Sequence, residues 1–184
     1  QALVEQNLCE SREKAKRSIL AGKVRVNGQL AHKASDPVKP TDTLVVESPE
    51  KFVSRGGHKL EHGLDQFHLE VTGLVAVDLG ASTGGFTDCM LSRGAVKVYA
   101  IDVGYGQLDW KLRQDARVVN MEKTNIRHLD PAGFPEQADF ISIDVSFISL
   151  GLILPVAAAL LKQDGDLVCL VKPQFEAGRE QVGK

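Results

Sequence analysis

The glycine-rich stretch DLGASTGGFTD, residues 78–88, directly follows the apolar run LVAV and has the composition of a ligand-binding turn. Glycine lets backbone N–H groups approach a ligand closely, because it has no side chain. The spacing comes within one residue of the phosphate-binding loop G-x-x-x-x-G-K-[ST], with Phe86 in place of the lysine. Without that ammonium group the β- and γ-phosphates of a nucleotide lose their main counter-charge, so the loop disfavours hydrolysis of nucleoside triphosphates.

The loop also departs from the dinucleotide fingerprint G-x-G-x-x-G, because Ser82 stands where the second glycine admits the pyrophosphate. Three carboxylates, Asp78, Asp102 and Asp144, follow apolar runs. Asp102 comes 22 residues after Gly80, the placement of an acid that accepts hydrogen bonds from ribose hydroxyls. A ligand with a ribose and no phosphates, such as S-adenosylmethionine, fits these features best. An NAD enzyme and a glycine turn without a ligand remain as alternatives.

The elements that must position these residues alternate between strand and helix along most of the chain, which predicts a doubly wound α/β sheet. The strands are nearly continuous in apolar residues, as expected for parallel strands covered on both faces. They are expected at LVAVDLG, VKVYAIDVG, RVVNME, FISIDVS and DLVCLVKP, with helices at KLEHGLDQF, at 85–93, near 107–113 and near 150–162. In the first of these helices, Leu60, Leu64 and Phe67 share one face. Ligands bind such sheets at the carboxyl ends of the strands.

The first 46 residues predict a separate small α+β module. Ser11 is a good N-cap for the helix REKAKRSILA, which Gly22 closes, and Asn27-Gly28 predicts a hairpin before a strand at 42–46. Residues 1–60 hold 11 Lys and Arg against 7 Asp and Glu, whereas the remainder holds 11 against 17. The basic side chains of the module are those of Arg12, Lys14, Lys16, Arg17, Lys23 and Arg25. They form either a phosphate-contacting face or a solvated surface.

The bulk composition predicts a soluble globular protein in the cytoplasm. Of the 184 residues, 43% are hydrophobic and 25% are charged, and no run approaches the roughly 18 apolar residues of a membrane span. No signal peptide is recognised. Cys9, Cys89 and Cys169 lie far apart, which favours a reducing compartment over a disulfide scaffold. The stretch ESPEKFVSRGG, residues 47–57, has the composition of a linker, and the larger domain is expected at 58–184.

The stretch LVEQNLCESREKAKRSILAGKVRVNG resembles the S-four-type RNA-binding domain. Six further motifs, SRGGHKLE, DLGASTGGFTD, AIDVGYGQLDWKLRQD, EKTNIR, IDVSFISL and LVKPQFEAG, together resemble the TlyA, or haemolysin A, family, whose members are similar to FtsJ-type ribose 2′-O-methyltransferases. The resemblance implies a Rossmann-like class I methyltransferase domain, incomplete at its C-terminus. It also implies S-adenosylmethionine as cofactor, 2′-O-methylation of cytidine, and ribosomal RNA or ribosomal subunits as partners. An RNA-binding protein without catalysis and, with less support, a cytolysin are the alternatives.

The FtsJ-like pattern uses Lys, Asp, Lys and Glu, and the first three match Lys59, Asp144 and Lys172. We expect Lys172 to be the base that accepts the hydroxyl proton, with the other two setting its charge state. Glu176 and Glu180 are too near Lys172 to be the fourth member, which is expected beyond residue 184.

The cofactor contacts expected from the loop, the strand ends and the resemblance are Asp78, Gly80, Ala81, Ser82, Gly84, Gly85, Phe86, Asp102, Val103, Glu122 and Asp144. Arg55 joins the six basic residues of the small module as an expected RNA contact. Asn125 is expected near an adenine together with Glu122, and Tyr105 could stack on a base. Core packing is the favoured role of Trp110.

Two other site types are weighed and set aside. His58, Glu61 and His62 form the inverted zinc signature H-x-x-E-H, but no third ligand is evident, so we expect a chance match and no metal. Cys89 falls in a helix and Cys169 in a strand, where both are expected to act as small core hydrophobes rather than as nucleophiles.

Overall fold

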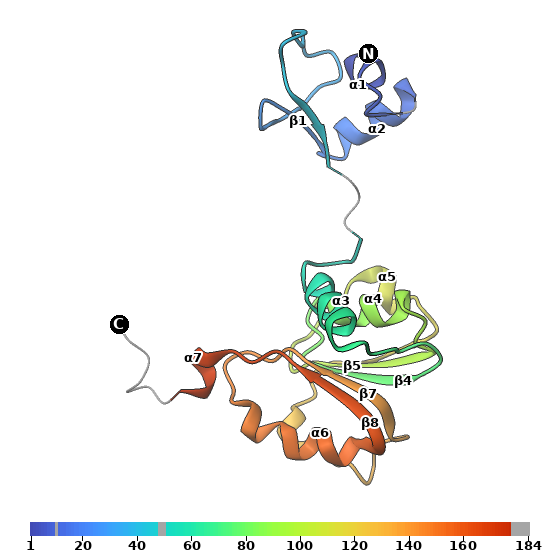
Figure 1. Ribbon diagram of the computed structural model, residues 1–184, viewed down its shortest axis with the longest axis vertical. Helices are drawn as coiled ribbons and strands as arrows, with labels where there is room; N and C mark the ends of the chain where they lie inside the picture. Colours follow the sequence, from blue (N-terminus) through green and yellow to red (C-terminus); the bar gives the residue numbers. More distant parts are fainter. Residues whose placement is uncertain (10, 48–50, 178–184) are drawn as a thin grey trace. The chain divides into compact units, whose positions relative to one another are not determined.

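The computed structural model describes residues 1–9, 11–47 and 51–177. The chain divides into two compact units, Gln1–Glu50 and Lys51–Lys184 (Figure 1). Each unit has its own hydrophobic core. None of the helices in the described part of the chain is both long and apolar enough to cross a membrane.

The first unit packs two helices, α1 (Ala2–Glu5) and α2 (Arg12–Leu20), against a three-stranded antiparallel sheet. The strands are β1 (Val24–Val26), β2 (Gln29–Leu30) and β3 (Leu44–Val46), in the order β2-β1-β3. Ser11 caps α2 as expected, since its Oγ accepts a hydrogen bond of 3.2 Å from the N–H of Lys14. The predicted hairpin is also confirmed: Asn27 and Gly28 have φ angles of 51° and 81°, the left-handed pair that a tight hairpin turn requires.

The second unit is built on a sheet of five parallel strands, in the order β6-β5-β4-β7-β8. The strands are β4 (Val75–Leu79), β5 (Lys97–Ile101), β6 (Val118–Met121), β7 (Ala138–Ile143) and β8 (Leu161–Cys169). The order runs outward from β4 in both directions, so the switch in strand order lies beside β4. This arrangement confirms the predicted doubly wound sheet.

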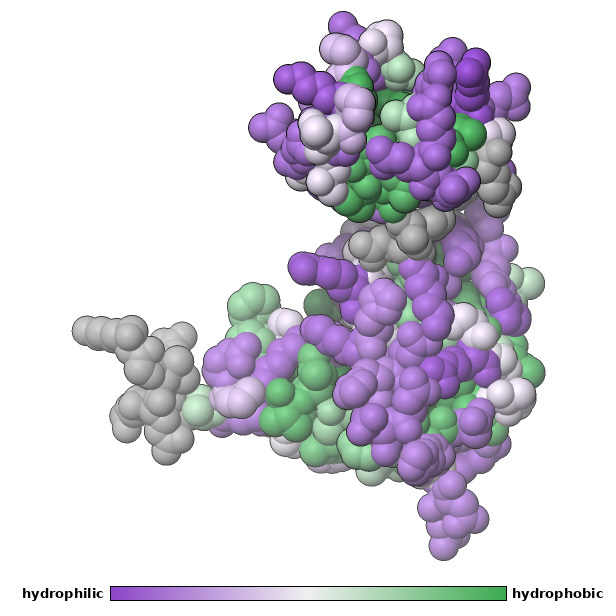
Figure 2. All heavy atoms as spheres, turned by 45° about the horizontal axis from the view of Figure 1, so that its top comes forward, coloured by the Kyte–Doolittle hydropathy of each residue, from purple (hydrophilic) through white to green (hydrophobic). Residues whose placement is uncertain are grey.

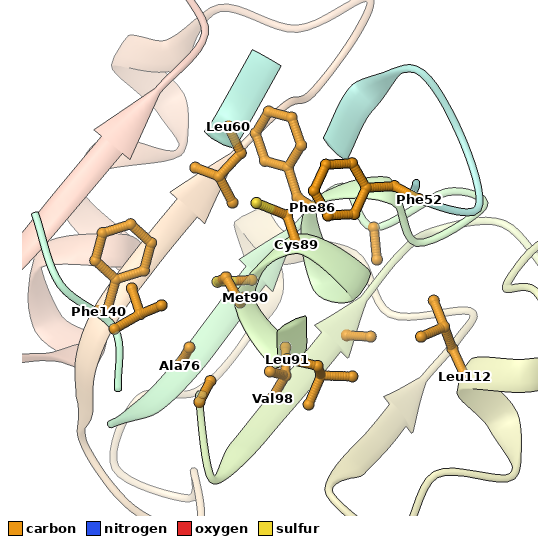
Figure 3. Close-up of a cluster of buried hydrophobic side chains, with 14 of the residues drawn as sticks. Phe52, Leu60, Ala76, Phe86, Cys89, Met90, Leu91, Val98, Leu112 and Phe140 are labelled. Atoms are coloured by element: carbon orange, nitrogen blue, oxygen red, sulfur yellow. The ribbon is translucent and has the colours of Figure 1, made fainter. Parts of the chain in front are cut away.

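Helices cover both faces of this sheet (Figure 1). On one face lie α3 (Gly56–Phe67), α4 (Gly85–Ser92) and α5 (Trp110–Arg113), and on the other lies α6 (Leu154–Leu160). Shorter turns are η1 (Ile126–His128), η2 (Leu150–Leu152) and α7 (Pro173–Glu176). Figure 3 shows the core of the first face, where Leu60 of α3 and Phe86, Cys89 and Met90 of α4 gather near Phe140 of β7.

The segment expected to be a linker contributes to the core of the second unit instead. Phe52 is only 2% exposed, and α3 begins at Gly56, before the expected domain start at residue 58. A Cβ on Gly57 would lie 2.4 Å from Cγ of Phe52, so the ring occupies the space that any other residue would fill. Residues 48–50 of the expected linker lie outside the described residues.

Phe67, expected to share a helix face with Leu60 and Leu64, and Trp110, expected to pack in the core, are both exposed. Phe67 is the last residue of α3, and the buried residues of that helix are Gly57, Leu60 and Leu64. Trp110 is 72% exposed, because α5 is a single turn whose buried residue is Leu112.

Candidate active site

The glycine loop begins where β4 ends, at the switch in strand order. Gly80 has a φ of 88°, and a Cβ there would lie 2.7 Å from the backbone oxygen of Asp144. The N–H groups of Gly80 and Ala81 donate to the carbonyl of Ile101, at 2.9 and 3.0 Å. The loop is therefore held between the ends of β5 and β7, and only glycine fits at its first position.

Two hollows open at the carboxyl ends of the strands and share Gly80, Ser82, Asp144 and Ser146. The first has a volume of about 640 Å³ and is also lined by Ser54, Arg55, Gly56, Lys59, Ala81, Thr83, Gly85, Phe86 and Lys172. The second has a volume of about 560 Å³ and is also lined by Asp102, Val103, Gln107, Thr124, Asn125, Ile126, Arg127, Val145, Phe147, Ile148 and Ile153. Both volumes are typical of small-molecule sites.

The three residues that match the Lys-Asp-Lys pattern line the first hollow together. Asp144 directly follows β7, and Lys172 comes three residues after β8, the parallel neighbour of β7. Lys59 lies in the first turns of α3. Lys59 makes no ion pair or hydrogen bond within the described residues.

Lys172 and Asp144 form a close ion pair, with Nζ and Oδ1 2.5 Å apart. The same Nζ donates to the backbone oxygen of Val145 and to Oγ of Ser146, both at 2.9 Å. Asp144 Oδ1 is buried and makes no well-aligned hydrogen bond within the described residues, so the lysine supplies its nearest positive charge. Two hydrogen-bond acceptors and the ion pair with Asp144 thus fix the terminal nitrogen of Lys172 at the edge of the hollow.

Asp102 organises the loop as well as facing the second hollow. Its Oδ2 accepts a hydrogen bond of 2.8 Å from the N–H of Ser82, and its Oδ1 accepts one of 2.7 Å from the N–H of Gly104. A carboxylate oxygen has a further lone pair, so each can still accept a bond from a ligand hydroxyl.

Two of the expected cofactor residues, Gly84 and Gly85, also allow close packing around the loop. Gly84 lines neither hollow; a Cβ there, at a φ of 94°, would lie 2.2 Å from Cδ1 of Leu112. Gly85 does line the first hollow, but a Cβ on it would lie 2.3 Å from Oγ of Ser54. These glycines let α5 and the segment before α3 approach the loop.

Asp78 and Glu122 were expected to contact the ligand, and the structure places neither in a hollow. Asp78 is completely buried and accepts hydrogen bonds from Thr87 Oγ1 at 2.7 Å and from Ser142 Oγ at 3.1 Å. Burial raises the pKa of Asp78 to about 6, although both hydrogen bonds lower it. The side chain therefore ties β4 to α4 and β7.

Glu122 stabilises the loop after β5. It accepts a hydrogen bond of 2.9 Å from the N–H of Gly106, and the guanidinium group of Arg113 pairs with it and holds its pKa below the usual range. Residues that follow Glu122 shortly afterwards in the chain, Thr124, Asn125 and Ile126, line the second hollow.

Phe147 is a site residue that the sequence did not single out. Its side chain is 91% exposed, its φ is 65°, and its ring centroid lies 5.2 Å from that of Phe175. It lines the second hollow together with Arg127. The sequence feature that could have indicated Phe147 is its position three residues after Asp144, in the loop that follows the buried strand β7.

The remaining candidates have clear structural roles. Burial raises the pKa of the Cys89 thiol to about 12, so it is a core residue and not a thiolate nucleophile. Glu61 of the zinc-like signature pairs with Lys51 and Arg93, while His58 Nδ1 lies 4.0 Å from it. Within the described ranges, no three His, Cys, Asp or Glu side chains are grouped as metal ligands.

The basic side chains of the first unit differ in their surroundings. Arg12, Lys16 and Arg17 project from α2, are exposed, and form no ion pair within the described residues. Arg25 pairs with Glu47 at 2.5 Å, so its charge is partly neutralised. Figure 2 shows hydrophilic side chains over most of the visible face of this unit, around a smaller apolar area.

Comparison with known proteins identifies both units. The family model of the FtsJ-like methyltransferase matches residues 52–184, and that of the S4 domain matches residues 1–44. The chain is 54% identical, over 99% of its length, to YqxC of Bacillus subtilis, which is named as a candidate rRNA methyltransferase. It is 49% identical, over 98% of its length, to the 16S/23S rRNA (cytidine-2′-O)-methyltransferase TlyA of Mycobacterium tuberculosis.

A candidate hemolysin from Streptococcus thermophilus has a similar solved structure, with a TM-score of 0.73 and 51% identity, covering 98% of this chain and 67% of that one. The chain spans 66% of the length of the Bacillus relative and 68% of that of the Mycobacterium relative. The chain belongs to the FtsJ-like methyltransferase family, and its first 44 residues form an S4 domain.

Proposed function

We propose that the protein is an S-adenosylmethionine-dependent methyltransferase that modifies ribosomal RNA at the ribose 2′-hydroxyl of cytidine. The observation that carries the proposal is the convergence of Lys59, Asp144 and Lys172 on one hollow beside the glycine loop. The names of the Mycobacterium and Bacillus relatives support RNA as the substrate. A substrate on ribosomal subunits would place the reaction in the cytoplasm.

The donors and acceptors around the two hollows fit S-adenosylmethionine. Asp102 offers acceptor oxygens for ribose hydroxyls, and Ile126 and Val145 supply an apolar wall for a purine. The first hollow offers the backbone of the glycine loop and the charge of Lys59 to the amino-acid end of the molecule. When bound, this cofactor supplies a methyl group on a sulfonium sulfur, which is a good leaving group.

The residues of the first hollow can remove the proton from a ribose hydroxyl. When Lys172 is a neutral amine, its two N–H groups can bond Val145 O and Ser146 Oγ, and its lone pair can accept a proton once the close contact of Nζ with Asp144 opens. Lys59 lines the same hollow, and the Asp144 carboxylate can balance the charge of the ammonium group that forms on proton transfer. The remaining requirement is an in-line arrangement of hydroxyl, methyl group and sulfur, which is a matter of positioning.

The alternative is an RNA-binding protein without catalysis. No glutamate of the described residues joins the Lys-Asp-Lys group, because Glu176 is engaged by Ser149 Oγ at 2.7 Å and by the N–H of Leu150 at 2.8 Å. Glu180 lies outside the described residues.

Mass mapping of methylated nucleosides in ribosomal RNA separates the two functions. We expect 2′-O-methylcytidine at one or more positions to be lost when the gene is deleted and restored by the parent gene. A gene that carries Lys172→Ala should not restore it. An unchanged set of methylated nucleosides after deletion, with the protein still bound to ribosomal RNA, would support the binding protein instead.

A further inference from the structure

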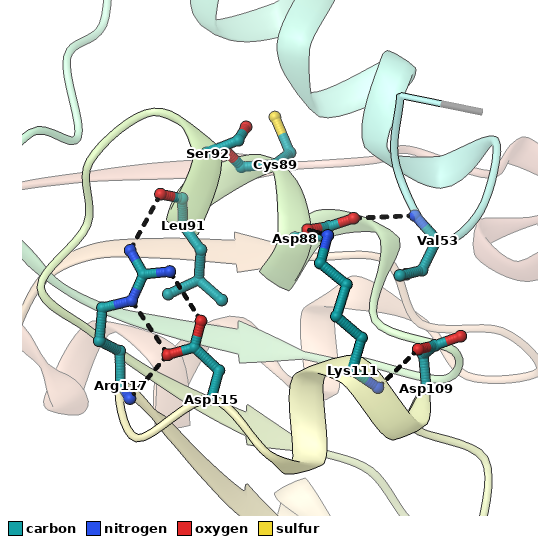
Figure 4. Close-up of polar contacts among 9 residues, drawn as sticks. All are labelled: Val53, Asp88, Cys89, Leu91, Ser92, Asp109, Lys111, Asp115 and Arg117. Carbon is teal, nitrogen blue, oxygen red and sulfur yellow. Dashed lines mark hydrogen bonds and ion pairs between the residues drawn. The ribbon is translucent and has the colours of Figure 1, made fainter. Parts of the chain in front are cut away.

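Asp88 is a buried carboxylate that the proposed chemistry does not use. It lies in the first turn of α4, directly after the glycine loop, and its side chain is 8% exposed. Its Oδ2 accepts a hydrogen bond of 2.9 Å from the backbone N–H of Val53, and its Oδ1 lies 3.1 Å from Nζ of Lys111 (Figure 4). The two oxygens therefore contact two separate segments of the chain.

The segment bonded to Oδ2 forms one wall of the first hollow. Ser54, Arg55 and Gly56 follow Val53 directly and line that hollow, as does Lys59 one turn later. This wall packs on the glycine loop without intervening side chains, because a Cβ on Gly85 would lie 2.8 Å from the backbone nitrogen of Gly57. A shift of the Val53 segment would therefore move Lys59 and the wall relative to the loop.

The segment bonded to Oδ1 supports the other side of the loop. Lys111 belongs to α5, and the N–H of its N-cap residue Asp109 donates to the carbonyl of Thr83 at 3.1 Å. Leu108 and Leu112 fill the space beside Gly84. Asp88 thus joins the two segments between which the loop is held.

The two contacts differ in strength. The Val53 N–H is partly buried, and within the described residues its acceptor is Asp88, so losing that acceptor would leave a donor unpaired. Lys111 is 69% exposed, and an exposed ammonium group is readily hydrated and screened. The hydrogen bond to Val53 is therefore the contact that should matter for the loop.

We propose that Asp88 is a positioning residue, which sets cofactor affinity by bonding the Val53 N–H and so holding the Lys59 wall against the glycine loop. This inference rests on the proposed function, because the ligand of the loop is taken to be S-adenosylmethionine. Loss of the Asp88 hydrogen bond should weaken cofactor binding rather than slow methyl transfer, because a bound cofactor would itself contact both the wall and the loop and restore their spacing. A change at Asp88 should therefore raise the KM for the cofactor more than it lowers kcat.

Three variants separate the two contacts. Asp88→Ala removes both, and Asp88→Asn keeps an amide oxygen for Val53 but loses the charge that faces Lys111. Lys111→Ala removes the exposed partner alone and serves as the matched control. Asp88→Ser, which is polar but too short to reach Val53, replaces Asp88→Ala if that variant does not fold.

The test is calorimetric titration with S-adenosylmethionine, together with hydrogen exchange at the Val53 amide in the protein without cofactor. We expect Asp88→Ala to weaken binding about tenfold, the lower part of the range for an unpaired buried donor, and to speed exchange at Val53. Asp88→Asn and Lys111→Ala should stay within about threefold of the parent. At saturating cofactor, kcat of Asp88→Ala should stay within about threefold as well.

Equal affinity in the parent and Asp88→Ala would overturn the inference, even if the variant melts at a lower temperature, because Asp88 would then serve stability alone. Loss of affinity in Asp88→Asn as large as in Asp88→Ala would overturn it too, since charge rather than the Val53 bond would be responsible. A parent protein that binds no S-adenosylmethionine would overturn the proposed function and this inference with it. The affinity of the parent therefore distinguishes the two failures.

Discussion

Individual carboxylates of the second unit have different roles because their surroundings differ. Asp78 and Asp102 both stand at the ends of neighbouring strands, but only Asp102 lines a hollow. Asp78 is enclosed by hydroxyl donors and has a pKa raised to about 6, whereas Asp144 is paired with an ammonium group. The same residue type thus holds the sheet together, lines a hollow or pairs with a lysine.

The role assigned to Asp102 can be tested by removing its carboxylate. Asp102→Ala should weaken binding of S-adenosylmethionine by about 1–3 kcal/mol, because the ligand hydroxyls lose their acceptor and the N–H groups of Ser82 and Gly104 lose theirs. Calorimetry with S-adenosylmethionine and NAD measures the effect. Binding of NAD alone by the parent protein would contradict the cofactor assignment.

Asp78 should give the protein a measurable pH dependence of stability. Its pKa is about 6 in the folded protein, above the ordinary value of 3.8, so the folded state binds the proton more tightly than the unfolded state. Between about pH 6 and pH 4 this term therefore raises the free energy of unfolding as the pH falls, by on the order of 2 kcal/mol. Asp78→Asn should lack the term, so denaturant unfolding of parent and variant should diverge across this range. If the unfolding free energies of parent and variant change in parallel with pH, Asp78 does not titrate in this range.

At the scale of elements, short sequence patterns predicted the features that depend on neighbouring residues alone, namely helix starts, hairpin turns and buried strands. Ser11 and the Asn27-Gly28 pair marked a helix start and a hairpin, and the apolar runs marked all five parallel strands. The burial of Phe52 could not be predicted, because it depends on where α3 packs relative to a distant helix. For the same reason, the resemblance indicated Lys59, Asp144 and Lys172, whereas the contacts of Asp88 and the exposure of Phe147 emerged only from the folded chain.

The packing of α5 on the glycine loop predicts an unequal response to alanine at two glycines. Gly84→Ala would combine a φ of 94° with a Cβ placed 2.2 Å from Leu112 Cδ1, so we expect a loss of about 2–4 kcal/mol of stability. Gly73 is the matched control: its φ is 76°, but nothing lies within 4 Å of an added Cβ. Gly73→Ala should lose only about 1 kcal/mol, the cost of backbone strain. Equal losses of unfolding free energy in the two variants, measured by denaturant unfolding, would show that α5 can move away from the added Cβ at no cost in stability.

At the scale of the whole molecule, the two units differ in charge and in the work we propose for them. Residues 1–50 hold 8 basic and 7 acidic side chains, whereas residues 51–184 hold 14 basic and 17 acidic ones. The S4 domain presents Arg12, Lys16 and Arg17 on α2, which form no ion pair within the described residues, and the methyltransferase unit carries the two hollows beside the glycine loop. Binding of RNA through phosphates and chemistry at the ribose can therefore be separated by mutation.

Charge reversal on α2 tests the RNA-binding half of this division. Changing Arg12, Lys16 and Arg17 to Glu should weaken binding to ribosomal RNA and flatten its dependence on salt. The reason is that each phosphate contact that is lost reduces the number of counterions released on binding. Lys39→Glu reverses an exposed charge of the same unit away from α2 and should change the slope little. A slope of affinity against salt that is unchanged in the triple variant would show that the α2 cations are only solvated.

Methyl transfer by Lys172 variants tests the account most directly. In the full-length protein, transfer of labelled methyl groups from S-adenosylmethionine to ribosomal RNA should fall by a factor of at least about 100 in Lys172→Ala, while cofactor and RNA affinities stay near those of the parent. Lys172→Arg should rescue little, since a guanidinium group stays protonated and cannot accept the hydroxyl proton. Methyl transfer by either variant at a rate near that of the parent would contradict the account and remove Lys172 from its role as the base.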